Sequence, residues 1–164
     1  MTFWQYIENA ALGSAYALAT GARALVWRAR RPMLIGVRAL IVRDDMVLLI
    51  RHRAGRTPWA LPGGGVERFE RMQAAAAREA AEESGVRMRV DYFLGLYDRF
   101  GGGASNYIGV FVGAPLNEPK PPRSVEIAEA RFFPLGALPT NTDVATRRRV
   151  AEYRSGARGL YRDW

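Results

Sequence analysis

The hydrophobic and polar positions of this chain change their pattern at Pro32. Before it, from Phe3 to Trp27, apolar residues recur every three or four positions, which predicts an amphipathic helix. The stretch without charge, residues 10–22, is shorter than the roughly 20 residues that a membrane-spanning helix needs. Four arginines, at positions 23, 28, 30 and 31, follow this uncharged stretch. The apolar positions are Trp4, Ile7, Ala11, Ala15, Leu18, Ala22 and Leu25.

Residues 1–31 therefore form a segment distinct from the predicted domain of residues 32–164. A signal peptide is not expected, because no positive charge precedes the apolar part and Glu8 stands in its place. We expect a cytoplasmic protein whose N-terminal helix packs on the domain or on a second copy, as in a homodimer. Contact of this basic, amphipathic helix with a membrane surface is the alternative.

After Pro32 the pattern indicates strands first, then a helix, more strands and a second helix. The first two strands flank Arg43-Asp44-Asp45, a predicted hairpin turn. The alanine- and glutamate-rich helix stops at Gly85, a residue that commonly ends helices. This order predicts an α/β (α+β) fold with a mixed sheet. Strands are expected at 33–42, 46–50, 90–97, 107–112 and 130–133, and helices at 71–84 and 143–154.

Composition narrows the chemistry. The chain has no cysteine and only one histidine, His52, so thiolate and multi-histidine metal sites are excluded. A metal would be held by oxygen, which favours Mg²⁺, Mn²⁺ or Ca²⁺. The net charge of +8 attracts anions, although arginine-rich codon usage in a bacterial genome explains the same imbalance. We expect the arginines of the last helix, 147–149, to be solvated.

Three glutamates of the first predicted helix lie on one face, because Glu79, Glu82 and Glu83 are spaced i, i+3 and i+4. Crowded carboxylates repel one another, and a hard divalent cation relieves that repulsion. The alternative is that they are solvated and pair with Arg78 or Arg71. The spacing of the wider stretch decides between these readings.

That stretch resembles the Nudix box, Gly-x5-Glu-x7-Arg-Glu-U-x-Glu-Glu-x-Gly-U, where U is a bulky aliphatic residue. The lead-in of residues 59–67 and the late stretch 129–139 resemble the same family, so the similarity covers about residues 31–139. All seven fixed letters are present, namely Gly64, Glu70, Arg78, Glu79, Glu82, Glu83 and Gly85.

The resemblance implies a Nudix-type αβα sandwich, with the mixed sheet between helices. It also implies a pyrophosphohydrolase that uses Mg²⁺, or Mn²⁺, to hydrolyse a nucleoside diphosphate linked to a moiety X. Its partner would be a small nucleotide or the 5′ end of an RNA, and no DNA is expected. A non-catalytic nucleotide-binding module and a membrane-peripheral protein acting through residues 1–31 are the competing functions.

Roles for single residues follow from the same resemblance. Glu79, Glu82 and Glu83 would bind the metal, and Arg78 would orient them. Glu83 or Glu79 would be the general base, while Glu126 or Glu129 would be a fourth ligand or the base. Further expected roles are phosphate binding by Gly63, Gly64, Gly65 and Arg53, base stacking or core packing by Trp59, and structural roles for Glu70 and Gly85.

Two positions depart from the family pattern. Ala80 is smaller than the usual aliphatic residue, which predicts looser packing of the helix. Phe69 stands where a glycine is common, and a bulky residue does not readily adopt a positive φ. We therefore expect the turn before Glu70 to have a different shape.

Overall fold

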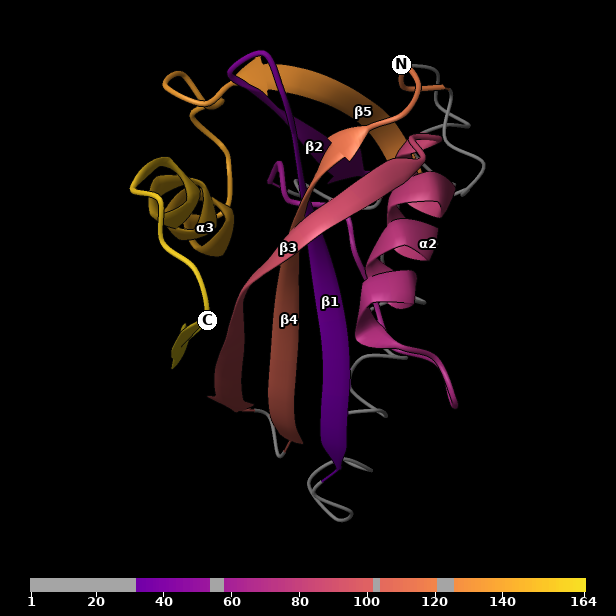
Figure 1. The fold of residues 1–164 in the computed structure, drawn as a ribbon, viewed down its shortest axis with the longest axis vertical. Helices are drawn as coiled ribbons and strands as arrows, with labels where there is room; N and C mark the ends of the chain where they lie inside the picture. The colour runs from indigo at the N-terminus through magenta and orange to yellow at the C-terminus, as the bar shows by residue number, and fades with distance from the viewer. Residues whose placement is uncertain (1–31, 54–57, 102–103, 121–125) are drawn as a thin grey trace, which may run out of the picture.

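The computed structural model describes residues 32–53, 58–101, 104–120 and 126–164 (Figure 1). The expected helix of residues 3–27 lies outside these ranges. All strands and helices expected after residue 32 are present, several of them longer than predicted, and β6 is additional. In order they are β1 (Met33–Arg43), β2 (Met46–His52), α2 (Met72–Ser84), β3 (Met88–Gly101), β4 (Ala104–Pro115), β5 (Ile127–Pro134), α3 (Val144–Arg154) and β6 (Leu160–Asp163).

The six strands form one mixed sheet in the order β5-β2-β1-β4-β3-β6. β1 pairs in parallel with β4 and antiparallel with β2, and β3 pairs antiparallel with β4 and in parallel with β6. Figure 1 shows α2 and α3 on opposite sides of the sheet. The expected mixed sheet between helices is confirmed.

Alternation along β1 divides the core between the two faces of the sheet. Val37, Ala39 and Ile41 belong to the cluster that contains the buried alanines of α2, whereas Leu40 packs in the cluster of Val150 from α3. Because successive strand residues point to opposite faces, β1 contributes to both cores. The position of α2 where the family usually has a larger aliphatic residue, Ala80, is fully buried in the first of these cores, beside Ala75 and Ala76.

Two tight turns use positive φ angles. Asp44 and Asp45, with φ of 48° and 62°, make the expected hairpin turn between β1 and β2. Phe69 has φ of 64°, so the expectation that its bulk would prevent this conformation was wrong. Its side chain is fully exposed and meets no steric obstacle, while Glu70 N–H donates to the Glu67 carbonyl at 3.2 Å and closes the turn.

Asp143 caps the N-terminus of α3, where its side chain accepts a hydrogen bond from the backbone N–H of Thr146. Arg149 is buried, with 2% of its surface exposed, so the expected solvated arginine face was wrong at this position. Its guanidinium lies 3.7 Å from the centre of the Tyr97 ring and pairs with Glu152. Within the described ranges, no helix is long and apolar enough to cross a bilayer.

Candidate functional site

The three glutamates expected to bind the metal, Glu79, Glu82 and Glu83, lie in the C-terminal half of α2. Glu82 and Glu83 belong to its last turn. The negative end of the helix dipole disfavours carboxylates there, and that turn contains no basic residue. Gly85 ends the helix in the left-handed conformation, with φ of 68°. A side chain at Gly85 would lie 2.8 Å from Cβ of Lys120, so the position also requires a small residue.

A glycine loop, residues 63–65, approaches these carboxylates from the side of β1. Backbone N–H groups of Val37 and Ala39 donate to the carbonyls of Gly64 and Pro62, both at 2.9 Å, which fixes the loop along the strand. Gly63 N–H then donates to Oε2 of Glu83 at 2.7 Å.

The absence of side chains lets the loop come this close. A Cβ on Gly64 would lie 2.5 Å from Oε1 of Glu79. One on Gly63, where φ is 151°, would lie 2.1 Å from the Val37 carbonyl oxygen. Two consecutive loop residues therefore lie against carboxylates of α2, Gly63 against Glu83 and Gly64 against Glu79.

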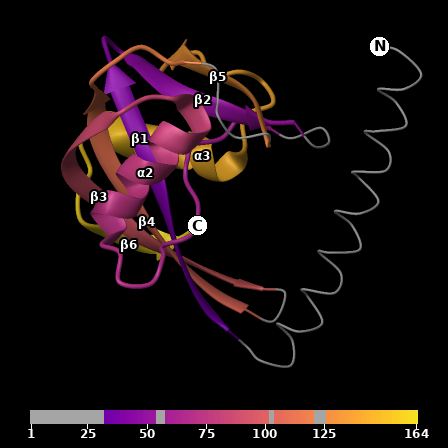
Figure 2. The same cartoon turned by 90° about the vertical axis from the view of Figure 1, so that its right-hand side faces the viewer.

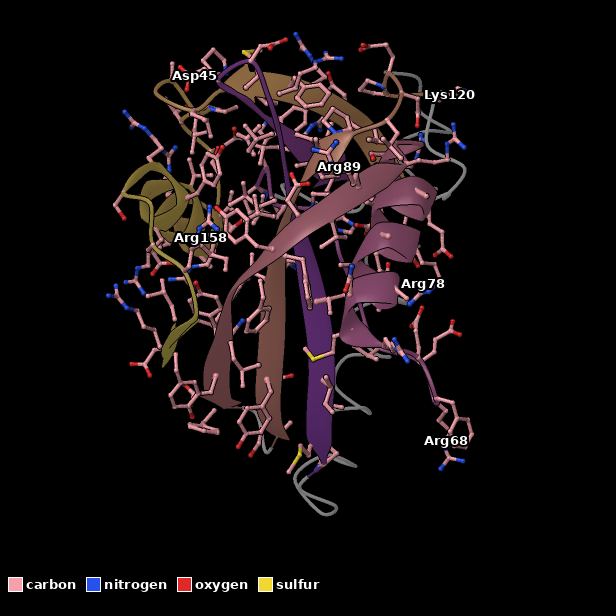
Figure 3. The ribbon with its side chains drawn as sticks, viewed as in Figure 1. Asp45, Arg68, Arg78, Arg89, Lys120 and Arg158 are labelled. Carbon is pink, nitrogen blue, oxygen red and sulfur yellow. The ribbon has the colours of Figure 1, made fainter. Side chains whose placement is uncertain are left out.

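Arg78 connects the acidic residues of the box; Figure 3 shows it on the side of α2 away from the sheet. Its Nε and Nη2 donate to the two carboxylate oxygens of Glu70 at 2.9 and 3.0 Å. Its Nη1 donates to Glu79 at 2.9 Å and to Glu82 at 3.4 Å, and Nη2 also reaches the Gly65 carbonyl at 3.0 Å. These hydrogen bonds hold the pKa of Glu70 below its ordinary value.

Among the carboxylates that the structure describes, Glu83 has the most strongly shifted pKa. Burial raises its pKa to about 7. The Gly63 N–H and the charge of Arg38 oppose this rise, and the charges of Glu79 and Glu126 add to it. Glu83 therefore titrates near neutral pH in the metal-free protein.

Arg38 is a residue of this region that sequence reasoning missed. It lies on β1, where its Nη1 donates to the Val37 carbonyl at 3.2 Å. Burial lowers the pKa of Arg38, while the nearby charges of Glu83, Asp143 and Glu79 raise it. The available signal was a single arginine within the apolar run MLIGVRALIV.

The other expected site residues lie near the ends of β2 and β5. Arg53 N–H donates to the Glu126 carbonyl at 2.7 Å, and Glu126 acts on Glu83 through its charge. Glu129 instead pairs with Arg51 at 3.2 Å. Trp59 is buried, 7% exposed, with its ring centre 4.7 Å from that of Phe133, so it packs in the core rather than offering an open face to a base.

The donor set suits a hard divalent cation, because Glu79, Glu82 and Glu83 offer only carboxylate oxygen. Among the residues that the structure describes, no three acidic or imidazole side chains converge into a metal-binding group. Arg78 holds Glu79 and Glu82 instead. A cation at the helix end would offset both the unfavourable dipole and the raised pKa of Glu83.

The sequence profile of the NUDIX domain matches residues 32–153. This chain belongs to the Nudix family. It is 35% identical over 124 residues to the protein named MutT4 of Mycobacterium tuberculosis (strain CDC 1551 / Oshkosh), an alignment covering 71% of this chain and 46% of that protein. The chain spans less than half the length of the first curated relatives that it matches.

Solved Nudix structures share the fold. The crystal structure of the MutT NUDIX hydrolase from Burkholderia pseudomallei superposes with a TM-score of 0.65 at 30% identity, covering 73% of this chain and 97% of that one. The crystal structure of a UDP-X diphosphatase superposes with a TM-score of 0.65 at 28% identity. The superposition covers 79% of this chain and 66% of that one. The similarity to the Burkholderia protein covers nearly all of that chain.

Proposed function

We propose that this protein hydrolyses a diphosphate linkage in a nucleoside diphosphate derivative, with a divalent cation bound at the end of α2. The observation that carries the proposal is the contact between the glycine loop and two box carboxylates. Gly63 binds Glu83 directly, and Gly64 leaves no space for a side chain beside Glu79. Two carboxylates and a glycine-rich backbone segment therefore meet at one place, an arrangement that suits phosphate chemistry assisted by a cation.

Glu79, Glu82 and Glu83 would hold the cation, with Mg²⁺ expected and Mn²⁺ a substitute. A bound Mg²⁺ polarises phosphoryl oxygens and lowers the pKa of water. Arg78 would then keep Glu70 in place and orient Glu79, the two carboxylates that it already contacts.

Glu83 is our leading general base, with Glu79 as the other choice. Glu83 lies against the glycine loop, where its carboxylate would accept a proton from the attacking water. The water oxygen forms a bond to one phosphorus, the bond from that phosphorus to the bridging oxygen breaks, and the bridging oxygen leaves with the second phosphate. Arg38, with its permanent positive charge near Glu83, would attract the anionic substrate.

The substrate class rests on the family and on one structural neighbour. The name of the UDP-X diphosphatase describes a substrate with a nucleoside diphosphate joined to a second group, and we propose the same general class here. Sugar nucleotides, dinucleotides, nucleoside triphosphates and 5′-triphosphorylated RNA all contain the required linkage.

The test is phosphate release from a panel of these compounds, measured with Mg²⁺, with Mn²⁺ and with chelator. We expect turnover that needs the metal and falls at least a hundredfold in Glu83→Gln. Glu118→Gln is the matched control, because Glu118 is an exposed glutamate paired with Arg43. Nucleotide binding without turnover on every compound would contradict the proposal and favour a non-catalytic module.

A further inference from the structure

Beyond the first turn of α2, the sheet carries exposed apolar side chains that no other described element covers. β1, β3 and β4 extend past the N-terminal end of that helix (Figures 1 and 2). On these extensions Met33 is 68% exposed, Ile35 is 48% exposed and Phe100 is 65% exposed. Large apolar side chains grouped on a surface usually mark a contact.

These side chains share one face of the sheet. Met33 and Ile35 continue the row of Val37, which packs under α2. Ile35 lies in register with Tyr107, and the Tyr107 and Phe100 rings meet edge to face at 6.2 Å between their centres. We call Met33, Ile35, Phe100 and Tyr107 the strand-end patch.

Helix α2 covers the adjoining part of the same face, and this cover ends at the first residue of the helix, Met72. A Cβ on Gly109 would lie 2.5 Å from Cε of Met72, the first residue of α2. Tyr107 is two residues before Gly109 and therefore lies beyond that cover. The strand-end patch thus continues the sheet surface that α2 buries, but α2 does not extend over the patch.

The segment of residues 1–31 joins the domain at the edge of this patch. Pro32 directly precedes Met33, and its carbonyl accepts a hydrogen bond from Ser105 N–H at 3.1 Å, which fixes the junction between β1 and β4. Leu18, Ala22 and Leu25 follow the helical spacing of the segment. The seven residues from Leu25 to Pro32 can span at most about 24 Å, whereas three strands are only about 10 Å across.

We propose that the N-terminal segment folds back within its own chain and lays its apolar side on the strand-end patch. Attachment at the patch edge gives the segment a high effective concentration there, so modest apolar burial is enough to hold it. Asp98 lies on the same face, in register with Tyr107, and its Oδ2 accepts a hydrogen bond from the Tyr161 hydroxyl at 2.7 Å, so this end of the sheet also carries a negative charge. This inference does not depend on the proposed hydrolysis.

Disulfide trapping in the full chain tests the proposal. Because the chain has no native cysteine, only the two introduced cysteines can form a disulfide. One variant combines Leu18→Cys with Phe100→Cys, and its matched control combines Leu18→Cys with Arg99→Cys. Arg99 is exposed and adjacent to Phe100 but points to the opposite face. We expect the disulfide within one chain to form at least tenfold faster with position 100 than with position 99.

Equal rates at the two positions would overturn the proposal. Disulfides that form at position 100 only between chains would also overturn it and assign the patch to a second copy.

Trypsin cleavage of the segment gives an independent readout, because it can cut after the arginines at 23, 28 and 30. Ile35→Asp should accelerate this cleavage at least fivefold. Val144→Asp, at an exposed apolar residue of α3, should leave the rate unchanged. Cleavage of the unaltered protein as fast as that of Ile35→Asp would show that the patch does not hold the segment.

Discussion

The backbone N–H of Gly63 donates to Oε2 of Glu83 at 2.7 Å and thereby ties the glycine loop to the last turn of α2. The loop is itself bonded along β1, so the position of Glu83 is set by the central strand as well as by its own helix. Small changes in the loop should therefore affect the carboxylates directly.

Gly64→Ala should reduce turnover by about tenfold or more. The new Cβ would lie 2.5 Å from Oε1 of Glu79, and the carboxylate must move to make room. Gly136→Ala is the control, because a Cβ at that turn glycine meets nothing within 4 Å. Steady-state kinetics of both variants checks the prediction, and equal activity would show that the position of Glu79 is not important for the reaction.

Arg78→Lys should lower turnover roughly 10–100-fold, a typical effect of losing a residue that orients metal ligands. A lysine keeps the charge but cannot contact Glu70, Glu79 and the Gly65 carbonyl at once, because it lacks the planar fork of the guanidinium. Arg71→Lys, at the exposed residue before α2, should have no effect. Titration calorimetry should show weaker Mg²⁺ binding by Arg78→Lys alone.

Glu83→Gln should stabilise the metal-free protein at pH 8. The folded-state pKa of Glu83, about 7, exceeds its unfolded value of 4.5. The stabilisation from its protonated form is thus complete below pH 4.5 and is lost as the pH rises through 7. The uncharged glutamine escapes that loss, which is on the order of 3 kcal/mol.

Thermal unfolding with chelator, followed from pH 5 to pH 8, measures this difference. The advantage of Glu83→Gln should shrink as the pH falls. Glu118→Gln should show no advantage at pH 8, because Arg43 lowers the pKa of Glu118 and that carboxylate favours folding when charged. A constant offset between Glu83→Gln and the unaltered protein at every pH would contradict the assigned pKa.

Arg149→Met should destabilise the fold by about 3–5 kcal/mol, because it leaves the mostly buried Glu152 without its main partner. The Tyr97 hydroxyl also donates to Glu152 at 2.8 Å, so a shift of the unpaired Glu152 carboxylate would weaken this hydrogen bond as well. Arg148→Met changes an exposed neighbour and should alter stability by less than about 0.5 kcal/mol. Urea denaturation of the two variants makes the comparison, and equal midpoints would refute it.

The regular elements and the spacing of the glutamates could be predicted because both depend on nearby residues. The apolar run of residues 33–42, ending at a turn, located β1, and the helical positions of Glu79 and Glu83 followed from their separation. β6 was missed, since it is four residues long, three of them exposed, and it is defined by its pairing with β3. Local sequence carries little information about such a strand.

Two arginines show why the rest could not be predicted. Arg149 stands in a run of three arginines, yet only it lies against Tyr97, a residue 52 positions earlier in the chain. Arg38 reaches the glutamates of α2 because the glycine loop returns to β1. In both cases the environment is created by a contact between distant segments, which spacing along the sequence does not encode.

The strand order has a consequence for how the protein is made. Every residue of the Nudix box is synthesised before β4, yet β4 lies between β1 and β3 and contributes Phe111 to the core beneath α2. Until β4 inserts, β1 and β3 have no shared neighbour and α2 lacks part of its support. During synthesis the chain therefore carries the complete motif for some time before it can form a site.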